Sequence, residues 1–175
     1  MNNNQLVAKA LAAATDTVAM EIGVDILDKV PVMFKEQFPE KRALIVADEN
    51  TWRVAGEAVY AHLQTVGVEC EQPYIFTDKH LHAEWRFIEM LDERLAATDA
   101  IAVAVGSGTI NDLCKLCSYH QSRPYMCVAT AASVDGYSSF GASITYKNMK
   151  QTFTCPAPKA ILADVGVMAR APKEM

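Results

Sequence analysis

The segment Gly106-Ser107-Gly108 contains two glycines that could hold a phosphate. It follows an unbroken apolar run from Ala100 to Val105. The run predicts a strand buried on both faces of a parallel sheet, and the residues from Ile110 to Tyr119 predict a helix directly after the turn. Backbone N–H groups at a helix N-terminus attract a phosphate, and glycines let a pyrophosphate approach the backbone closely. We therefore expect a nucleotide cofactor to bind at this turn.

The glycine spacing alone does not distinguish a nucleotide site from a tight turn, because it matches neither G-x-G-x-x-G nor the G-x-x-x-x-G-K-[ST] loop. A second polar cluster runs from Thr130 to Ser139, after another predicted strand, and Asp48 follows an earlier one. In a parallel sheet, ligands bind beyond the carboxyl ends of the strands. We therefore expect Asp48, the glycine turn and the second cluster to face one crevice.

Apolar segments with alternating strand and helix patterns must position these clusters. We expect strands at residues 43–47, 70–76, 100–105, 125–129 and 159–163, and helices at residues 6–22, 25–38, 52–66, 83–97 and 110–122. This order predicts a Rossmann-like α/β fold, a parallel sheet with right-handed crossovers and helices on both faces. Residues 142–146 and 151–155 predict a short β-hairpin around Lys147-Asn148, and residues 171–174 resemble the beginning of a further helix.

Length and composition predict one soluble domain. The chain has 175 residues, of which 51% are apolar, so it can bury a sizeable core. No apolar run is long enough to span a bilayer, and the N-terminus lacks the pattern of a secretion signal, so we expect a cytoplasmic protein without a membrane partner. A net charge of −5, without clustered Lys or Arg, argues against nucleic acid as a partner.

The cysteines and histidines offer two further candidate sites. Cys114-x-x-Cys117 could serve redox chemistry or bind a metal, but the sequence supplies no second ligand pair, so we expect both residues to pack in a helix. His80-x-His82 could also bind a metal, but no partner carboxylate is evident, and a surface pair at a helix start is the simpler interpretation. An odd count of five cysteines predicts reduced thiols.

The motifs resemble those of a known superfamily. Gly106 to Lys115, GSGTINDLCK, resembles the GGGxxxDxxK motif of the iron-containing alcohol dehydrogenase, glycerol dehydrogenase and dehydroquinate synthase superfamily. Thr130 to Ser139, TAASVDGYSS, is similar to the more specific TAxSxDGxxS stretch of the sn-glycerol-1-phosphate dehydrogenases, and residues 158–164 and 170–173 also match that family. The resemblance extends from Asp25 onward and implies the dehydroquinate synthase-like N-terminal domain, which binds NAD or NADP.

The resemblance implies roles for individual residues. Asp48 would accept hydrogen bonds from the adenosine ribose and repel a 2′-phosphate, although a helix N-cap is an equal alternative. Ser139 would lie near the nicotinamide, and Asp135 would face the substrate unless it only forms a turn with Gly136. The implied cofactor-binding residues are Asp48, Gly106, Gly108, Thr109, Ile110, Asn111, Asp112, Thr130, Ala131, Ala132, Ser133 and Ser139.

Complete members of the family transfer a hydride reversibly between NAD(P)H and dihydroxyacetone phosphate, a small phosphate substrate, to give sn-glycerol 1-phosphate. Zn²⁺ or a similar divalent ion is held there by one aspartate and two histidines of a helical C-terminal domain, and none of the four histidines here matches them. The resemblance therefore implies that the metal ligands lie beyond Met175.

We accordingly expect residues 1–175 to be the NAD(P)-binding half, without catalytic or metal-binding residues and without appreciable activity alone. An apolar face left uncovered by the absent helical domain would favour a homo-oligomer.

Three alternatives stay open. A glycerol or iron-type alcohol dehydrogenase shares the glycine motif but not the Thr130–Ser139 pattern. A dehydroquinate synthase-like lyase would use the same cofactor pocket, and a non-catalytic nucleotide-binding module would bind cofactor without turnover in any form.

Overall fold

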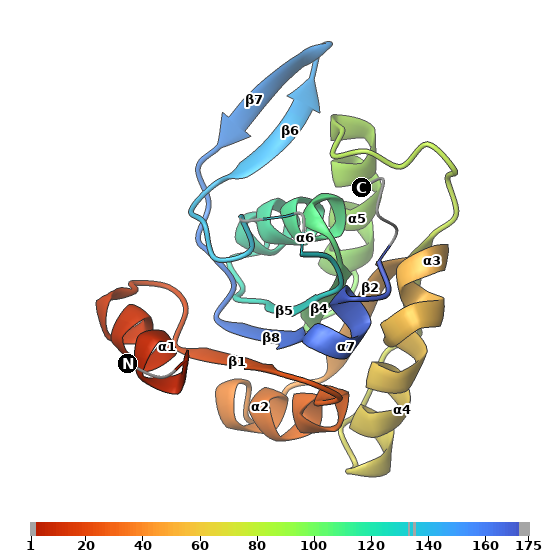
Figure 1. Cartoon of the computed structure of the whole chain (residues 1–175). Coiled ribbons are helices and arrows are strands. Elements are labelled where there is room, and N and C mark those ends of the chain that lie inside the picture. The colour runs from red at the N-terminus through yellow and green to blue at the C-terminus, as the bar shows by residue number, and fades with distance from the viewer. Residues whose placement is uncertain (1–2, 133, 135, 172–175) are drawn as a thin grey trace.

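A parallel sheet between two helical layers forms the body of the protein (Figure 1). The computed structural model describes residues 3–132, 134 and 136–171. Within these residues the sheet has six strands in the order β1-β8-β5-β4-β2-β3, and every neighbouring pair is parallel. The strands are β1 (Ala19–Gly23), β2 (Ala43–Asp48), β3 (Tyr74–Phe76), β4 (Ile101–Gly106), β5 (Met126–Ala129) and β8 (Ala160–Asp164). The expected α/β class is confirmed.

The helices divide between the two faces of the sheet. They are α1 (Asn3–Ala13), η1 (Leu27–Lys29), α2 (Val30–Gln37), α3 (Glu49–Thr51), the π-turn η2 (Trp52–Gly56), α4 (Glu57–Thr65), α5 (Trp85–Ala96), α6 (Gly108–His120) and α7 (Val165–Met168). Helices α5 and α6 pack together over one face, and α2 and α4 pack together over the other (Figure 1). Within the described residues, no helix is both long and apolar enough to cross a membrane.

Burial on both faces of the sheet explains why the sequences of the central strands are continuously apolar. In β4, Ala102 and Ala104 pack under α5 and α6, while Ile101, Val103 and Val105 pack against α2 and α4. A strand covered on both faces needs apolar side chains at successive positions, rather than at every second one. This constraint made β2, β4, β5 and β8 predictable.

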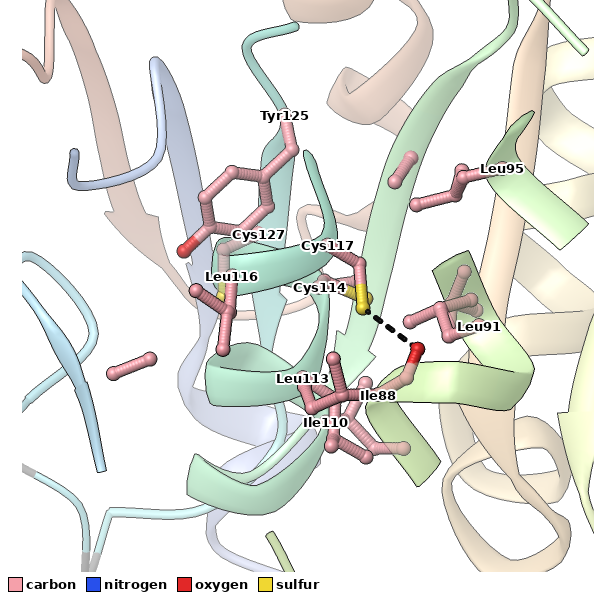
Figure 2. Packing of buried hydrophobic residues seen from close by; sticks show 14 of the residues in the cluster. Ile88, Leu91, Leu95, Ile110, Leu113, Cys114, Leu116, Cys117, Tyr125 and Cys127 are labelled. Carbon is pink, nitrogen blue, oxygen red and sulfur yellow. Dashed lines mark hydrogen bonds between the residues drawn. The ribbon is translucent and has the colours of Figure 1, made fainter. Parts of the chain in front are cut away.

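The cysteines of α6 belong to this core (Figure 2). Cys114 and Cys117 are fully buried, and the thiol of Cys117 donates to the carbonyl oxygen of Ile88 at 3.5 Å. Burial raises the pKa of both thiols well above the ordinary value, which keeps them protonated and unreactive. The prediction that they are packing residues is confirmed.

The prediction of one helix over residues 6–22 is wrong. Helix α1 ends at Ala13, and Ala19–Gly23 is the edge strand β1, paired with β8. The hydroxyl of Thr17 donates to the carbonyl oxygen of Pro158 at 2.7 Å and anchors the entry to β1. Alanine, methionine and glutamate favour helices, but pairing with β8 outweighs that weak preference.

A hairpin, β6 (Ala142–Tyr146) and β7 (Met149–Phe153), projects away from the sheet (Figure 1). The expected turn at Lys147 and Asn148 is present, since both residues have positive φ, as a two-residue hairpin turn requires. The hairpin packs against the start of α5, where the ring of Trp85 lies 4.8 Å from that of Tyr146 and 5.4 Å from that of Phe153.

The carboxylate of Asp164 joins two loops at the carboxyl end of β8. Oδ1 accepts from the backbone N–H groups of Asp25, Gly166 and Val167, and Oδ2 accepts from that of Ile26 at 2.7 Å. Burial raises the pKa of Asp164, but these four donors together outweigh burial and hold the pKa below its ordinary value. Asp164 therefore fixes the β1–α2 loop and the start of α7 together.

We predict that Asp164→Asn lowers the free energy of unfolding by about 3 kcal/mol, because an amide N–H₂ would face the Ile26 N–H. A depressed pKa stabilises the fold above the unfolded-state pKa of about 3.9, and this contribution is lost as the pH falls through the folded-state value. Urea unfolding from pH 7 to pH 3 should show a weaker pH dependence in the variant. The exposed Asp28→Asn control should change stability by less than about 0.5 kcal/mol; equal stabilities of the two variants would contradict this assignment.

Candidate functional site

A crevice opens at the carboxyl ends of the strands. Strands β2 and β4 are neighbours, yet the helices that follow them pack on opposite faces of the sheet. Their connections therefore diverge and leave room for a ligand between them, as at the switch point of other doubly wound sheets.

Two adjoining hollows make up the crevice. The β3-side hollow, of about 460 Å³, is lined by residues that include Asp48, Phe76, Lys79, Leu81, Ser107 and Thr109. The β8-side hollow, of about 490 Å³, is lined by residues that include Arg53, Val54, Thr130, Val167 and Arg170. Asn50 and Thr51 line both, so the hollows meet above the end of β2. Together they extend across the ends of β3, β2, β4, β5 and β8.

Helix α6 begins inside the crevice. Its N-cap is Ser107, and no side chain caps this end, so first-turn N–H groups remain available to a ligand. Ser107 and Thr109 both line the β3-side hollow. This end of α6 therefore presents backbone donors and the positive end of a helix dipole to the crevice.

Gly106 is required by packing. A Cβ atom there would lie 2.5 Å from Cβ of Ile110, whose side chain is fully buried. Glycine thus lets α6 start directly against the strand that precedes it. The side chain of Ile110 fills the space under Gly106, and its predicted contact with the cofactor stays a prediction.

Asn111 and Asp112, also expected at the cofactor, have partners elsewhere. Asn111 is 1% exposed and its Oδ1 accepts from the hydroxyl of Tyr125 at 2.9 Å. Oδ2 of Asp112 accepts from the backbone N–H of Ser143 at 3.1 Å. Burial raises the pKa of Asp112, although Ser143 and Lys115 oppose the shift. These contacts brace α6 against the start of β6, and cofactor binding by Asp112 stays a prediction.

Asp48 has the position expected of a ribose partner and also caps a helix. Its Oδ1 accepts from the N–H groups of Asn50 at 2.8 Å and Thr51 at 3.0 Å, while Thr51 Oγ1 accepts from the Asp48 N–H at 3.0 Å. This reciprocal capping box fixes the carboxylate at the edge of the β3-side hollow. The N-cap role is thus present, and ribose binding stays a prediction.

The Thr130–Ser139 segment borders the same crevice from β5. Thr130 and Ala131 are buried, and the Thr130 N–H donates to the carbonyl oxygen of Gly106 at 3.2 Å. Ala132 and Ser139 are exposed. The predicted contacts at Ser133 and Asp135 lie outside the described residues.

One anchor of this segment was not predicted. The buried hydroxyl of Tyr137 donates to the carbonyl oxygen of Ala131 at 3.0 Å and lies 3.4 Å from that of Gly106. Burial raises the pKa of Tyr137 to about 12, so the hydroxyl remains a donor at neutral pH. It closes the segment back onto the end of β4.

Other residues of the crevice were not predicted because they lie three or more residues beyond the ends of their strands, in the following loops and helices. They are Lys79 and Leu81 after β3, Arg53 and Val54 after β2, and Val167 and Arg170 after β8. The rule that ligands bind at carboxyl ends would have found them. Arg53 is held in place by Glu49 O at 3.0 Å and Asn50 Oδ1 at 2.8 Å.

A metal ion does not fit the described part of the chain. Among the residues that the structure describes, no group of three or more His, Cys, Asp or Glu side chains could hold one. His80 and His82 are exposed before α5, as expected of a surface pair.

The metal ligands that the family resemblance implies beyond Met175 stay a prediction. Met175 itself lies outside the described residues, as do the other residues from 172 onward, where the sequence predicts the beginning of a helix. The described residues therefore form the crevice, but they do not include a group of side chains that could hold a metal ion.

The family model and the sequence relatives that match this chain point to the same family. Residues 21–172 match the family model described as iron-containing alcohol dehydrogenase. The glycerol-1-phosphate dehydrogenase [NAD(P)+] of Halalkalibacterium halodurans is 34% identical over 161 residues, which cover 89% of this chain and 39% of that protein. The chain thus spans about two fifths of the length of that relative.

Solved structures share the fold at lower identity. Glycerol dehydrogenase from Schizosaccharomyces pombe aligns with a TM-score of 0.75 at 20% identity, over 91% of this chain and 40% of its own. A 2-deoxy-scyllo-inosose synthase complexed with carbaglucose-6-phosphate, NAD+ and Co2+ aligns with a TM-score of 0.73 at 16% identity, over 87% of this chain and 43% of its own.

The two glycines of the turn should respond differently to alanine. Gly106→Ala should lower the free energy of unfolding by about 1–3 kcal/mol, because its Cβ would overlap Ile110. Gly108→Ala should leave stability within about 0.5 kcal/mol of wild type, because its Cβ would lie 3.4 Å from Val134, an ordinary contact. Urea unfolding measures both, and a stable Gly106→Ala protein would overturn the packing role.

Proposed function

The chain belongs to the iron-containing alcohol dehydrogenase family, and from that membership we propose that its crevice binds NAD or NADP. The observation that carries the proposal is the uncapped start of α6 between two hollows, with the Asp48 carboxylate beside it. A pyrophosphate suits the N–H groups at the start of α6, and a hollow on each side suits the two nucleosides.

The two hollows suit different halves of the dinucleotide. In the β3-side hollow, Asp48 would accept hydrogen bonds from the hydroxyls of the adenosine ribose, and Leu81 offers apolar surface for the adenine ring. The β8-side hollow, which Thr130 lines together with the apolar side chains of Val54 and Val167, would take the nicotinamide. The residues present therefore fit the cofactor.

The chain's own contribution to chemistry is binding and orientation. When bound, the nicotinamide ring supplies hydride transfer. Ser107 and Thr109 would fix the pyrophosphate, and the Thr130–Ser139 segment would fix the position of the ring, a positioning contribution to catalysis. Asp135 would face a small phosphate substrate.

For the longer protein we propose reduction of dihydroxyacetone phosphate to sn-glycerol 1-phosphate. The glycerol-1-phosphate dehydrogenase name of the H. halodurans relative supports this substrate. Zn²⁺ or another divalent ion would be held by residues beyond the matched part of that relative, and the NAD+ and Co2+ bound by the inosose synthase support a metal-dependent cofactor site in this fold. We also propose a cytoplasmic protein, with self-association as the state of the isolated chain.

A fluorescence titration of the chain with NADH tests the cofactor site. Wild type should bind saturably and release NADH to ADP-ribose, and Gly108→Val should weaken binding at least tenfold, because a branched side chain would stand where the pyrophosphate approaches. Gly108→Ala serves as the folded control. Absence of saturable binding by wild type would overturn the proposal. Retained binding without turnover, in the chain and in a longer form, would favour a non-catalytic module over an enzyme.

Asp48→Asn should shift the preference from NADH toward NADPH by about tenfold. Asparagine keeps the N-cap but removes the charge that strengthens bonds from the ribose hydroxyls and repels a 2′-phosphate. The ratio of the two Kd values measures the shift, and unfolding in urea confirms that the cap is retained. An unchanged ratio would show that Asp48 is a cap only.

A further inference from the structure

Lys115 is a buried cation inside α6, remote from the crevice lining. Its side chain is fully buried, which is rare for lysine unless the charge is satisfied. Nζ donates to three backbone carbonyl oxygens, those of Ser139 at 2.8 Å, Gly141 at 3.1 Å and Gly136 at 3.4 Å. An ammonium group has three donors, so the three carbonyls match its full capacity.

Asp112 supports the same arrangement one helical turn earlier. Its Oδ1 lies 3.8 Å from Lys115 Nζ, and its Oδ2 accepts from the N–H of Ser143 at the start of β6. Four bonds therefore tie α6 to the stretch from Gly136 to Ser143. Burial lowers the pKa of Lys115, and the Asp112 carboxylate opposes that shift.

The tied stretch continues directly from the segment that borders the crevice. Tyr137 holds it from the other side, through its hydroxyl bonds to Ala131 and Gly106. Residues 130–131 and 136–141 are thus tied to two places, the end of β4 and the interior of α6. Removing either tie should let them move relative to the start of α6, while the Asp48 side keeps its own capping box.

We propose that Lys115, supported by Asp112, is a positioning residue that holds residues 136–141 against the nicotinamide half of the bound cofactor. The inference rests on the proposed cofactor site. The two halves of the ligand should respond differently, because Lys115 donates to residues 136–141, and none of these residues is among the described lining of the hollow that contains Asp48. Loss of Lys115 should therefore weaken binding of the complete dinucleotide, while binding of its adenosine diphosphate part is preserved.

The experiment compares Kd values for NADH and ADP-ribose, which lacks the nicotinamide. Lys115→Met should raise the Kd for NADH about tenfold, leave that for ADP-ribose within about twofold, and reduce the fluorescence enhancement of bound NADH. Arg123→Met is the matched control. Arg123 also donates to three carbonyl oxygens, those of Leu95, Thr98 and Ala100, at the far end of the sheet. It should lose stability without changing the ratio of the two Kd values.

Tyr137→Phe provides a milder variant if Lys115→Met does not fold, because it keeps the ring and removes only the hydroxyl. It should change the Kd ratio in the same direction. Equal weakening of NADH and ADP-ribose, or an unchanged ratio in a folded variant, would overturn the positioning role. Failure of wild type to bind either ligand would instead overturn the proposed cofactor site.

Discussion

The structure depends on the divergence of the two connections that follow the neighbouring strands β2 and β4. Strands β2 and β4 are hydrogen-bonded along their length, but the chain leaves them toward opposite faces of the sheet. The divergence creates the crevice, and the close approach of Ile110 to Gly106 lets α6 begin at its edge. Backbone donors can face a ligand there because the helix starts without an intervening loop.

Buried polar groups then hold the loops around this opening. The Asp164 carboxylate accepts hydrogen bonds from four backbone N–H groups beside β8, and the Lys115 ammonium group donates to three carbonyl oxygens beside β6. Each charge is satisfied by several backbone groups, so the desolvation cost of burial is offset. Fixing loops in this way lowers the cost of ordering for a ligand that binds beside them.

The fold was predictable where one physical rule dominated. Strands buried on both faces needed apolar residues throughout, and the turn at Lys147-Asn148 needed positive φ. The edge strand β1 was not predictable, since its residues favour a helix and only pairing with β8 decides. At the site, spacing located the glycine turn but not the direction of each side chain, so the hydrogen bond from Tyr125 to Asn111 was not predicted.

Backbone hydrogen exchange with and without NADH tests the central claim, that the crevice at the carboxyl ends binds a dinucleotide. The account predicts slower exchange on binding at residues 48–51, 106–109, 130–132 and 167–171, which border the two hollows. Residues around Arg123 and Lys159, at the opposite end of the strands, should exchange as before. Protection at that opposite end, or protection at neither end under saturating NADH, would contradict the account.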